Sequence, residues 1–120
     1  MTQYFADHEL ACKCGCGELK FDPEFRLIIE SIRSVCGFAL PVSSGYRCEN
    51  HPAESRKEKP GAHSRGVAVD FAVSHDRAFK VIQVALNHGI RRIGVNQKGS
   101  GRFIHLDVDV TLPAPTIWSY

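Results

Sequence analysis

The chain has 120 residues, enough for one domain with a single core and too few for two. Charged residues make up 23% and hydrophobic residues 43%, the ordinary balance of a soluble globular protein. The formal net charge of +2 gives no indication of nucleic-acid binding, although a mild positive charge is compatible with a polyanionic cell wall as partner.

The amino-terminal residues show neither the basic region nor the apolar region of a secretory signal. No apolar run approaches the ~18 residues that a membrane span needs. We therefore expect a protein made and kept in the cytoplasm, without membrane contact. Action outside the cell would need lysis, a holin-type hole or delivery in a virus particle.

Five cysteines follow, an odd count that argues against a complete disulfide framework in a chain without a visible signal. Three of them form the run Cys12-Lys13-Cys14-Gly15-Cys16, which lacks the spacing of two to four residues found in zinc knuckles. Reduced thiols are the favoured interpretation. The alternatives are a second metal, held by this run with Cys36 or Cys48, and a redox protein based on the run.

Two amphipathic helices are predicted. The first follows an N-cap at Asp22 with Pro23 in its first turn, and ends at Gly37, which suits a left-handed cap. The second follows Ser74 and stops at Gly89. Their apolar residues recur at helical spacing: Phe25, Ile28, Ile29, Ile32 and Val35 in the first, and Ala78, Val81, Ile82, Ala85 and Leu86 in the second.

Short strands complete the predicted fold, at 40–43, 67–73, 93–95 and 103–110, with a glycine-rich hairpin turn at 98–101. Helices and strands in this order predict an α+β fold, with a small, mostly antiparallel sheet and flanking helices.

Two further segments have no periodicity. Segment 48–60 is polar and bounded by proline, which predicts a loop, and its His51 and Glu54 are either substrate contacts or, as we expect, solvated residues. In the tail, Trp118 and Tyr120 either pack against the domain or face a partner.

Two of the predicted strands carry polar residues on one face. Asp70 interrupts an apolar run and shares its face with alanines, while His105 and Asp107 lie opposite an aliphatic row formed by Ile104, Leu106, Val108 and Val110. If these strands meet in one sheet, Asp70 and His105 come together, and His63 from the preceding loop can complete a trio. Taken singly, each is an ordinary surface or turn residue. Together, two imidazoles and a carboxylate leave a tetrahedral Zn²⁺ one open position, as in catalytic zinc sites.

Three motifs stand in order along the chain: Ser44-Gly45-Tyr46-Arg47, Gly61-Ala62-His63-Ser64-Arg65-Gly66-Val67-Ala68-Val69-Asp70, and Phe103-Ile104-His105-Leu106-Asp107. In order and spacing they resemble the zinc D-Ala-D-Ala carboxypeptidase family, which shares its fold with the signalling domain of hedgehog proteins. The resemblance extends from about Phe5 to Asp109. It implies a hedgehog/D-Ala-D-Ala peptidase-like fold and a zinc ion held by His63, Asp70 and His105.

The same resemblance implies roles for other residues. Arg47 would grip the terminal carboxylate of the substrate or the developing oxyanion, and Ser64 would contribute to substrate binding. Several relatives carry an acid three residues before the last zinc-ligating histidine, where this chain has Arg102. Asp107, two residues after His105 on the same strand face, is therefore the expected catalytic base or supporting residue.

The function that the resemblance implies is a monomeric zinc metallopeptidase acting on peptidoglycan stem peptides. It would be a D-Ala-D-Ala carboxypeptidase or a crosslink endopeptidase, of the phage or prophage lytic type without its own wall-binding module. Because the expected acid is replaced, a second hypothesis from another class stays open. This is a catalytically silent, zinc-stabilised binding domain or virion structural protein.

Overall fold

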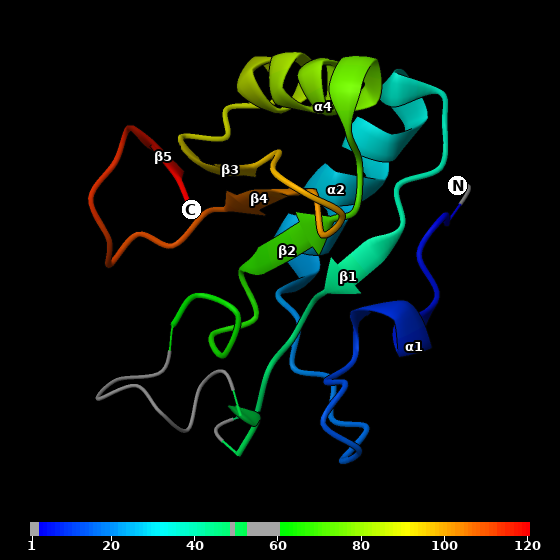
Figure 1. The fold of residues 1–120 in the computed structure, drawn as a ribbon. Coiled ribbons are helices and arrows are strands. Elements are labelled where there is room, and N and C mark those ends of the chain that lie inside the picture. Colours follow the sequence, from blue (N-terminus) through cyan, green and yellow to red (C-terminus); the bar gives the residue numbers. More distant parts are fainter. Residues whose placement is uncertain (1–2, 49, 53–60) are drawn as a thin grey trace.

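A computed structural model describes residues 3–48, 50–52 and 61–120 (Figure 1). The described helices are α1 (Asp7–Leu10), α2 (Pro23–Cys36) and α4 (His75–Asn87). The strands are β1 (Val42–Ser44), β2 (Ala68–Phe71), β3 (Arg92–Asn96), β4 (Phe103–Asp107) and β5 (Thr116–Ser119). Within the described ranges, no helix is long and apolar enough to span a bilayer.

The strands form one five-stranded sheet in the order β1-β2-β4-β3-β5. Neighbouring strands are antiparallel except β3 and β5, which run parallel. The prediction of a mostly antiparallel sheet was therefore wrong, since the sheet is mixed. The difference comes from the tail, which carries two prolines, Pro113 and Pro115, and gave no strand signal. It crosses beyond β3 and adds β5 at the sheet edge.

Both predicted long helices are confirmed, and α2 has its expected end signals. Ser74 lies at the N-cap of α4 as predicted, but its side chain makes no capping hydrogen bond, and the helix ends at Asn87 with His88 as its C-cap. The Asp22 carboxylate accepts a hydrogen bond from the Phe25 amide at 2.9 Å, and Gly37 ends α2 with φ of 78°. Each apolar stripe is narrower than predicted, because Val35 is 57% exposed and Leu86 is 59% exposed.

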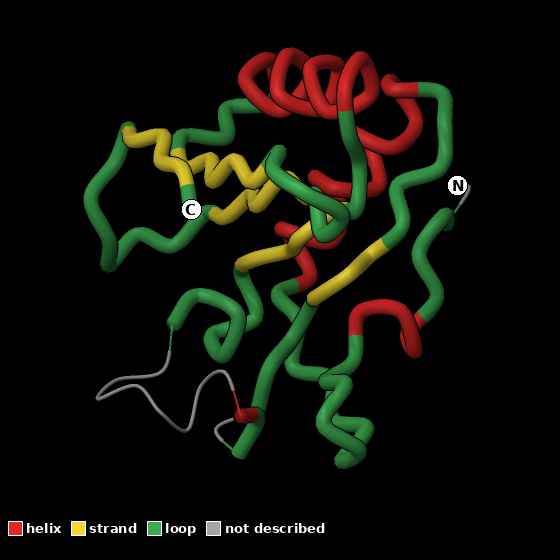
Figure 2. The backbone as a smooth tube through the Cα atoms, in the orientation of Figure 1, coloured by secondary structure: helices red, strands yellow, loops and turns green. Residues whose placement is uncertain are grey.

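The core lies between one face of the sheet and the two long helices, which pack against each other (Figure 1). Its fully buried members include Phe25, Ile29, Ile32, Val69, Phe71, Val81, Ile104 and Leu106. Side chains alternate along a strand, so the residues between these core positions face the other side of the sheet. The loop 61–67 lies at the start of β2, on the side away from α4 (Figure 2). Side chains from this loop can therefore meet those of the uncovered face.

One predicted strand is shorter in the structure, and one predicted loop is only partly described. The strand expected over 103–110 stops at Asp107, and Val110 is 95% exposed, so the aliphatic row is shorter than predicted. Of the predicted loop 48–60, Glu54 lies outside the described residues. His51 is described, and its backbone amide donates to the Cys48 carbonyl at 3.0 Å.

Gly66 anchors the loop before β2 to the start of α2. It has φ of +73°, and its carbonyl accepts a hydrogen bond from the Asp22 amide at 2.8 Å. A Cβ at this position would collide with the backbone carbonyl of Lys20. We expect Gly66→Ala to lower the free energy of unfolding by about 2 kcal/mol, from left-handed backbone strain and from this collision.

Urea denaturation measures the effect, and Gly99→Ala is the matched control. Gly99 also has positive φ, +64°, but nothing lies within 4 Å of its Cβ direction. That variant should lose only about 1 kcal/mol. Equal losses in the two variants would contradict the role of the Lys20 contact.

Candidate metal centre

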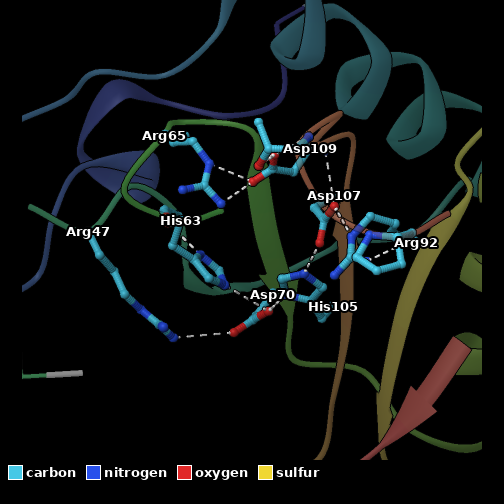
Figure 3. A network of polar contacts seen from close by, with 11 residues as sticks. Arg47, His63, Arg65, Asp70, Arg92, His105, Asp107 and Asp109 are labelled. Carbon is cyan, nitrogen blue, oxygen red and sulfur yellow. Dashed lines mark hydrogen bonds and ion pairs between the residues drawn. The ribbon is translucent and has the colours of Figure 1, made fainter. Parts of the chain in front are cut away.

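Strand pairing brings together the two predicted strand ligands. In the register of β2 and β4, Asp70 lies directly opposite His105, as the sequence predicted. The His105 Nδ1 lies 2.8 Å from Asp70 Oδ1, and the His63 Nε2 lies 3.4 Å from the same oxygen. All three side chains are buried, each residue being 6% exposed. The structure therefore places two imidazole nitrogens and one carboxylate oxygen around one point (Figure 3).

Each imidazole is held from behind by an acceptor. The His63 Nδ1 donates to the Gly45 carbonyl at 2.8 Å, which leaves Nε2 to face Asp70. The His105 Nε2 lies 2.6 Å from Asp107 Oδ2, so Nδ1 faces Asp70. Hydrogen bonds of this kind fix the ring orientation and tautomer of metal-binding histidines. The support of His63 by Gly45 could not be predicted, because a backbone carbonyl leaves no signal in the sequence.

Hydrogen bonding inside the centre shifts the pKa values of Asp70 and His105 in opposite directions. Burial raises the pKa of Asp70, but hydrogen bonds from His105 and His63 outweigh it and hold that pKa well below its usual range. Burial lowers the pKa of His105, yet its hydrogen bonds to Asp107 and Asp70 leave it raised. Asp70 is therefore anionic in this setting, and its negative charge favours a positive charge close to it.

A zinc ion fits this donor set. Two neutral imidazoles and one carboxylate are ligands that Zn²⁺ accepts, with bonds of about 2.0–2.2 Å. In tetrahedral geometry such bonds separate the ligand atoms by roughly 3.3–3.6 Å. The three donor atoms of His63, Asp70 and His105 lie within 4.8 Å of one another. The hydrogen-bonded pair of His105 Nδ1 and Asp70 Oδ1, now 2.8 Å apart, would have to separate slightly to admit the ion.

Asp107 lies behind His105 and is 1% exposed. Its Oδ2 contacts the His105 ring, while its Oδ1 accepts from Arg92 Nε at 2.8 Å and from the Asp109 amide at 3.1 Å. Both carboxylate oxygens are therefore engaged. Arg92 in turn stacks over the Trp118 ring, 4.8 Å from its centroid. The sequence identified Asp107 as important, but the arginine that holds it was not predicted.

Arg47 borders the site from the other side. Its guanidinium nitrogen lies 3.6 Å from Asp70 Oδ2, and its Nε donates to the Ser44 hydroxyl at 2.9 Å. The backbone amide of Arg47 donates to the His63 carbonyl at 3.1 Å. The Ser64 hydroxyl donates to the Arg47 carbonyl at 2.7 Å, so Ser64 contacts the segment that carries the arginine.

Arg102 lies in the hairpin turn before β4. Its Nε donates to the Gly99 carbonyl at 3.0 Å, and one of its guanidinium nitrogens lies 3.1 Å from His75 Nε2. Neither partner belongs to the candidate metal centre. Arg102 is thus directed toward the start of α4.

A hollow of about 280 Å³ lies in front of the metal donors. Besides the donors and Arg47, its wall includes the apolar and aromatic side chains of Phe103, Leu112, Trp118 and Tyr120. Gly94 makes room for this wall, since a Cβ there would lie 2.8 Å from both Trp118 and Tyr120. The tail therefore packs against the site, which answers the question that the sequence left open.

Asp109 does not join the metal centre. It pairs with Arg65, whose Nε lies 2.6 Å from its Oδ2, and its other oxygen accepts from the Thr111 amide and hydroxyl. Burial raises the pKa of Asp109, but the hydrogen bonds from Thr111 and Arg65 leave it below the usual value of 3.8. A depressed pKa in the folded state stabilises the fold above the unfolded pKa, and this contribution is lost as the pH falls through the folded pKa.

We expect Asp109→Asn to reduce the acid dependence of stability. Between about pH 5 and about pH 2, the wild type should lose about 1 kcal/mol more of its free energy of unfolding than the variant. Urea denaturation at a series of pH values measures the difference. The exposed Asp76→Asn is the control, and a variant curve parallel to wild type would contradict the assignment.

The cysteines fall into two groups. Cys36 is buried in the main core, whereas Cys12, Cys14, Cys16 and Cys48 gather at a separate place with their sulfur atoms within 4.8 Å of one another. All five are free thiols.

Comparison with known families identifies the chain. The sequence model of a family described as Peptidase M15 matches residues 3–107, which include every residue of the candidate metal centre. The chain therefore belongs to the peptidase M15 family of zinc D-Ala-D-Ala carboxypeptidase-like enzymes. A search of the curated proteins gives no match.

Proposed function

We propose that this member of the M15 family is a zinc-dependent peptidase that cuts the stem peptides of peptidoglycan. One observation carries the proposal. His63, Asp70 and His105 direct their donor atoms to one point at the wall of a hollow that Arg47 also borders. Family membership supports a metallopeptidase, and the donor set supports zinc.

The three donors would hold the ion, and each has its own support. Asp70 supplies the negative charge, while His63 and His105 present the nitrogens that Gly45 and Asp107 leave directed inward. When bound, Zn²⁺ supplies Lewis acidity, which polarises a carbonyl group and acidifies water. Burial of the donors keeps bulk water from competing with these interactions.

Arg47 supports the choice of substrate. Its guanidinium reaches the edge of the hollow beside Asp70, and an arginine there can bind a carboxylate through two parallel hydrogen bonds. A free peptide carboxyl terminus is such a group. This favours a carboxypeptidase that removes a terminal D-alanine, with a crosslink endopeptidase as the second candidate.

The aromatic wall would complete substrate binding. Trp118 and Tyr120 add apolar surface to the hollow that Arg47 also lines, which suits a peptide end with small methyl side chains. Burial raises the pKa of Tyr120, so its phenol stays protonated at neutral pH and can donate a hydrogen bond.

Asp107 would act as a positioning residue. To accept a proton, its carboxylate would have to give up either the contact of Oδ2 with His105 or the two hydrogen bonds that Oδ1 accepts, from Arg92 and from the Asp109 amide. Holding His105 in its metal-binding orientation requires no such release. We further propose that the chain works as a single monomeric domain of the phage lytic type.

Mass spectrometry of defined muropeptides tests the function. Pentapeptide monomers and crosslinked dimers are incubated with zinc-loaded protein and with chelator-treated protein. We expect chelator-sensitive loss of one D-alanine from the monomer, and a monomer ending in L-alanine serves as the stereochemical control. Cleavage of the dimer alone would replace the carboxypeptidase by the endopeptidase.

One observation favours a second candidate, a silent zinc domain that binds or builds structure. Arg102 takes the place of the acid that several relatives carry, and both oxygens of Asp107 are already bonded. A zinc-loaded protein that yields no product from either muropeptide would support this candidate and overturn the peptidase.

A further inference from the structure

Four cysteines from two distant segments meet near the amino-terminal helix α1. Cys12, Cys14 and Cys16 lie in the loop that follows α1, and Cys48 lies directly after Arg47. The Cys48 sulfur is 3.6 Å from that of Cys12, 3.4 Å from that of Cys14 and 3.6 Å from that of Cys16. The sulfur atoms of Cys12 and Cys14 are 3.4 Å apart. The remaining pairs lie within 4.8 Å.

These distances do not fit disulfide bonds, in which the sulfur atoms are about 2.05 Å apart. They fit a shared cation. Zinc–sulfur bonds of about 2.3 Å in tetrahedral geometry place the sulfur atoms roughly 3.8 Å from one another. Four of the six sulfur pairs lie close to this spacing and the other two lie within 4.8 Å, as expected of ligands around one ion.

The loop geometry explains how a run with single-residue spacing can supply three ligands. Gly15 has φ of 107° and Gly17 has φ of 69°, conformations that a residue with a side chain rarely adopts. The backbone therefore turns after Cys14 and again after Cys16, which directs alternate side chains toward Cys48. The usual knuckle spacing is replaced here by left-handed turns at glycine.

Backbone amides also point at the sulfur atoms. The Cys48 amide donates to the Cys12 sulfur at 3.3 Å, and the Glu18 amide donates to the Cys16 sulfur at 3.4 Å. Such hydrogen bonds stabilise negative charge on sulfur, which a metal-bound thiolate carries. Cys12 and Cys48 also pack with Tyr46 in a small apolar cluster, so one side of the group is shielded from water.

We propose that Cys12, Cys14, Cys16 and Cys48 form a structural zinc site, distinct from the centre at His63, Asp70 and His105. Four cysteine ligands close the coordination sphere, so the ion stabilises the fold and leaves no position for a substrate.

The site would hold in place the segment that carries Arg47. Next to Cys48, the Tyr46 amide donates to the Leu10 carbonyl at 2.8 Å. A Cβ at Gly45 would lie 2.6 Å from that same carbonyl oxygen, so the two segments are in close contact. A zinc ion bound by both the loop after α1 and Cys48 would stabilise this contact. Cys48 directly follows Arg47, so the ion would also restrict the position of Arg47.

Cobalt substitution tests the site in the full chain. Tetrahedral Co²⁺ bound by thiolates gives intense sulfur-to-metal charge-transfer absorption, which the histidine and aspartate donors of the other centre cannot produce. The test variant is Cys14→Ser with Cys16→Ser, because both side chains are exposed and their loss should leave the metal-free fold intact. The matched control is Cys36→Ala, whose thiol lies in the main core.

We expect the charge-transfer band in wild type, Cys36→Ala and Asp70→Asn, and its loss in the double variant. Bound zinc should fall from about two equivalents in wild type to about one in the double variant and to about one in Asp70→Asn. A reduced wild type without the band, or a double variant that keeps it, would overturn the proposal. Iron in place of zinc in the purified chain would overturn zinc as the resident metal. Because the readout is spectroscopic, failure of this site and failure of the peptidase are distinguishable.

Discussion

Asp70→Asn is expected to reduce hydrolysis of the stem peptide by roughly 10³-fold or more. The substitution keeps the size of the side chain but removes the only carboxylate among the three proposed metal donors. His63 and His105 both face Asp70 Oδ1, so loss of the carboxylate removes the negative charge at the point where the three donors meet. An amide oxygen is a much weaker zinc ligand than a carboxylate, and the metal should dissociate.

Initial rates with the preferred muropeptide, together with the bound zinc per chain, measure the result. Asp76→Asn is the matched control, since Asp76 is an exposed acid in the first turn of α4 and lies outside the hollow. It should keep the full rate and the full zinc content. An Asp70→Asn variant that hydrolyses muropeptides within tenfold of wild type would contradict the metal assignment.

Asp107→Asn should weaken zinc binding by roughly 10²-fold through its effect on His105. The Asp107 carboxylate orients the His105 ring and is itself held by Arg92. A neutral amide at this position would weaken its interactions with both His105 and Arg92. The hydrolysis rate at limiting zinc should fall in proportion to zinc occupancy. At saturating zinc, most of the rate should return, because a positioning residue acts through the metal ligand.

The zinc titration separates the two roles that the sequence left open for Asp107. If Asp107 is the catalytic base, the variant lacks that base at every zinc concentration, and its rate should stay low even with the metal fully bound. Asp109→Asn is the matched control, because Asp109 is the next buried acid and its side chain pairs with Arg65. That variant should bind zinc with nearly wild-type affinity.

Periodicity and cap residues predicted the parts of the fold that depend on local signals. Asp22 and Gly37 mark the ends of α2, and the glycine-rich turn after β3 lies between two antiparallel strands, as expected. The exposure of Val35 and the loss of Val110 from β4 could not be predicted in this way. They depend on where the core ends, which is a property of packing between elements and not of one segment.

The tail shows the same limit more clearly. Its strand β5 pairs with β3 in parallel, a long-range contact for which residues 113–120 carry no alternation long enough to give a signal. As a result, the roles of Trp118 and Tyr120 in the hollow were unpredictable. Arg92 was missed for a related reason, since an arginine in a short strand is usually solvated.

The candidate site was predictable where side-chain type and strand alternation agreed. Asp70 and His105 share one face because each lies on the polar row of its strand, and the register confirms that they meet. The convergence of four cysteines was harder to predict, because Gly15 and Gly17 determine it through backbone turns. A spacing rule taken from other zinc sites did not include that geometry.

The cross-strand pairing of Asp70 with His105 also determines which changes in length the chain can tolerate. Between these two residues the chain forms α4, β3 and the 97–102 turn. The distance between Asp70 and His105 nevertheless depends only on the register of β2 and β4. Insertions in that turn, or an added turn of helix at the end of α4, would leave the two donors opposite each other. A single-residue insertion within β2 or β4 would instead turn one donor to the opposite face of the sheet. Length variation among related chains should therefore gather in these connections and be absent from the two paired strands.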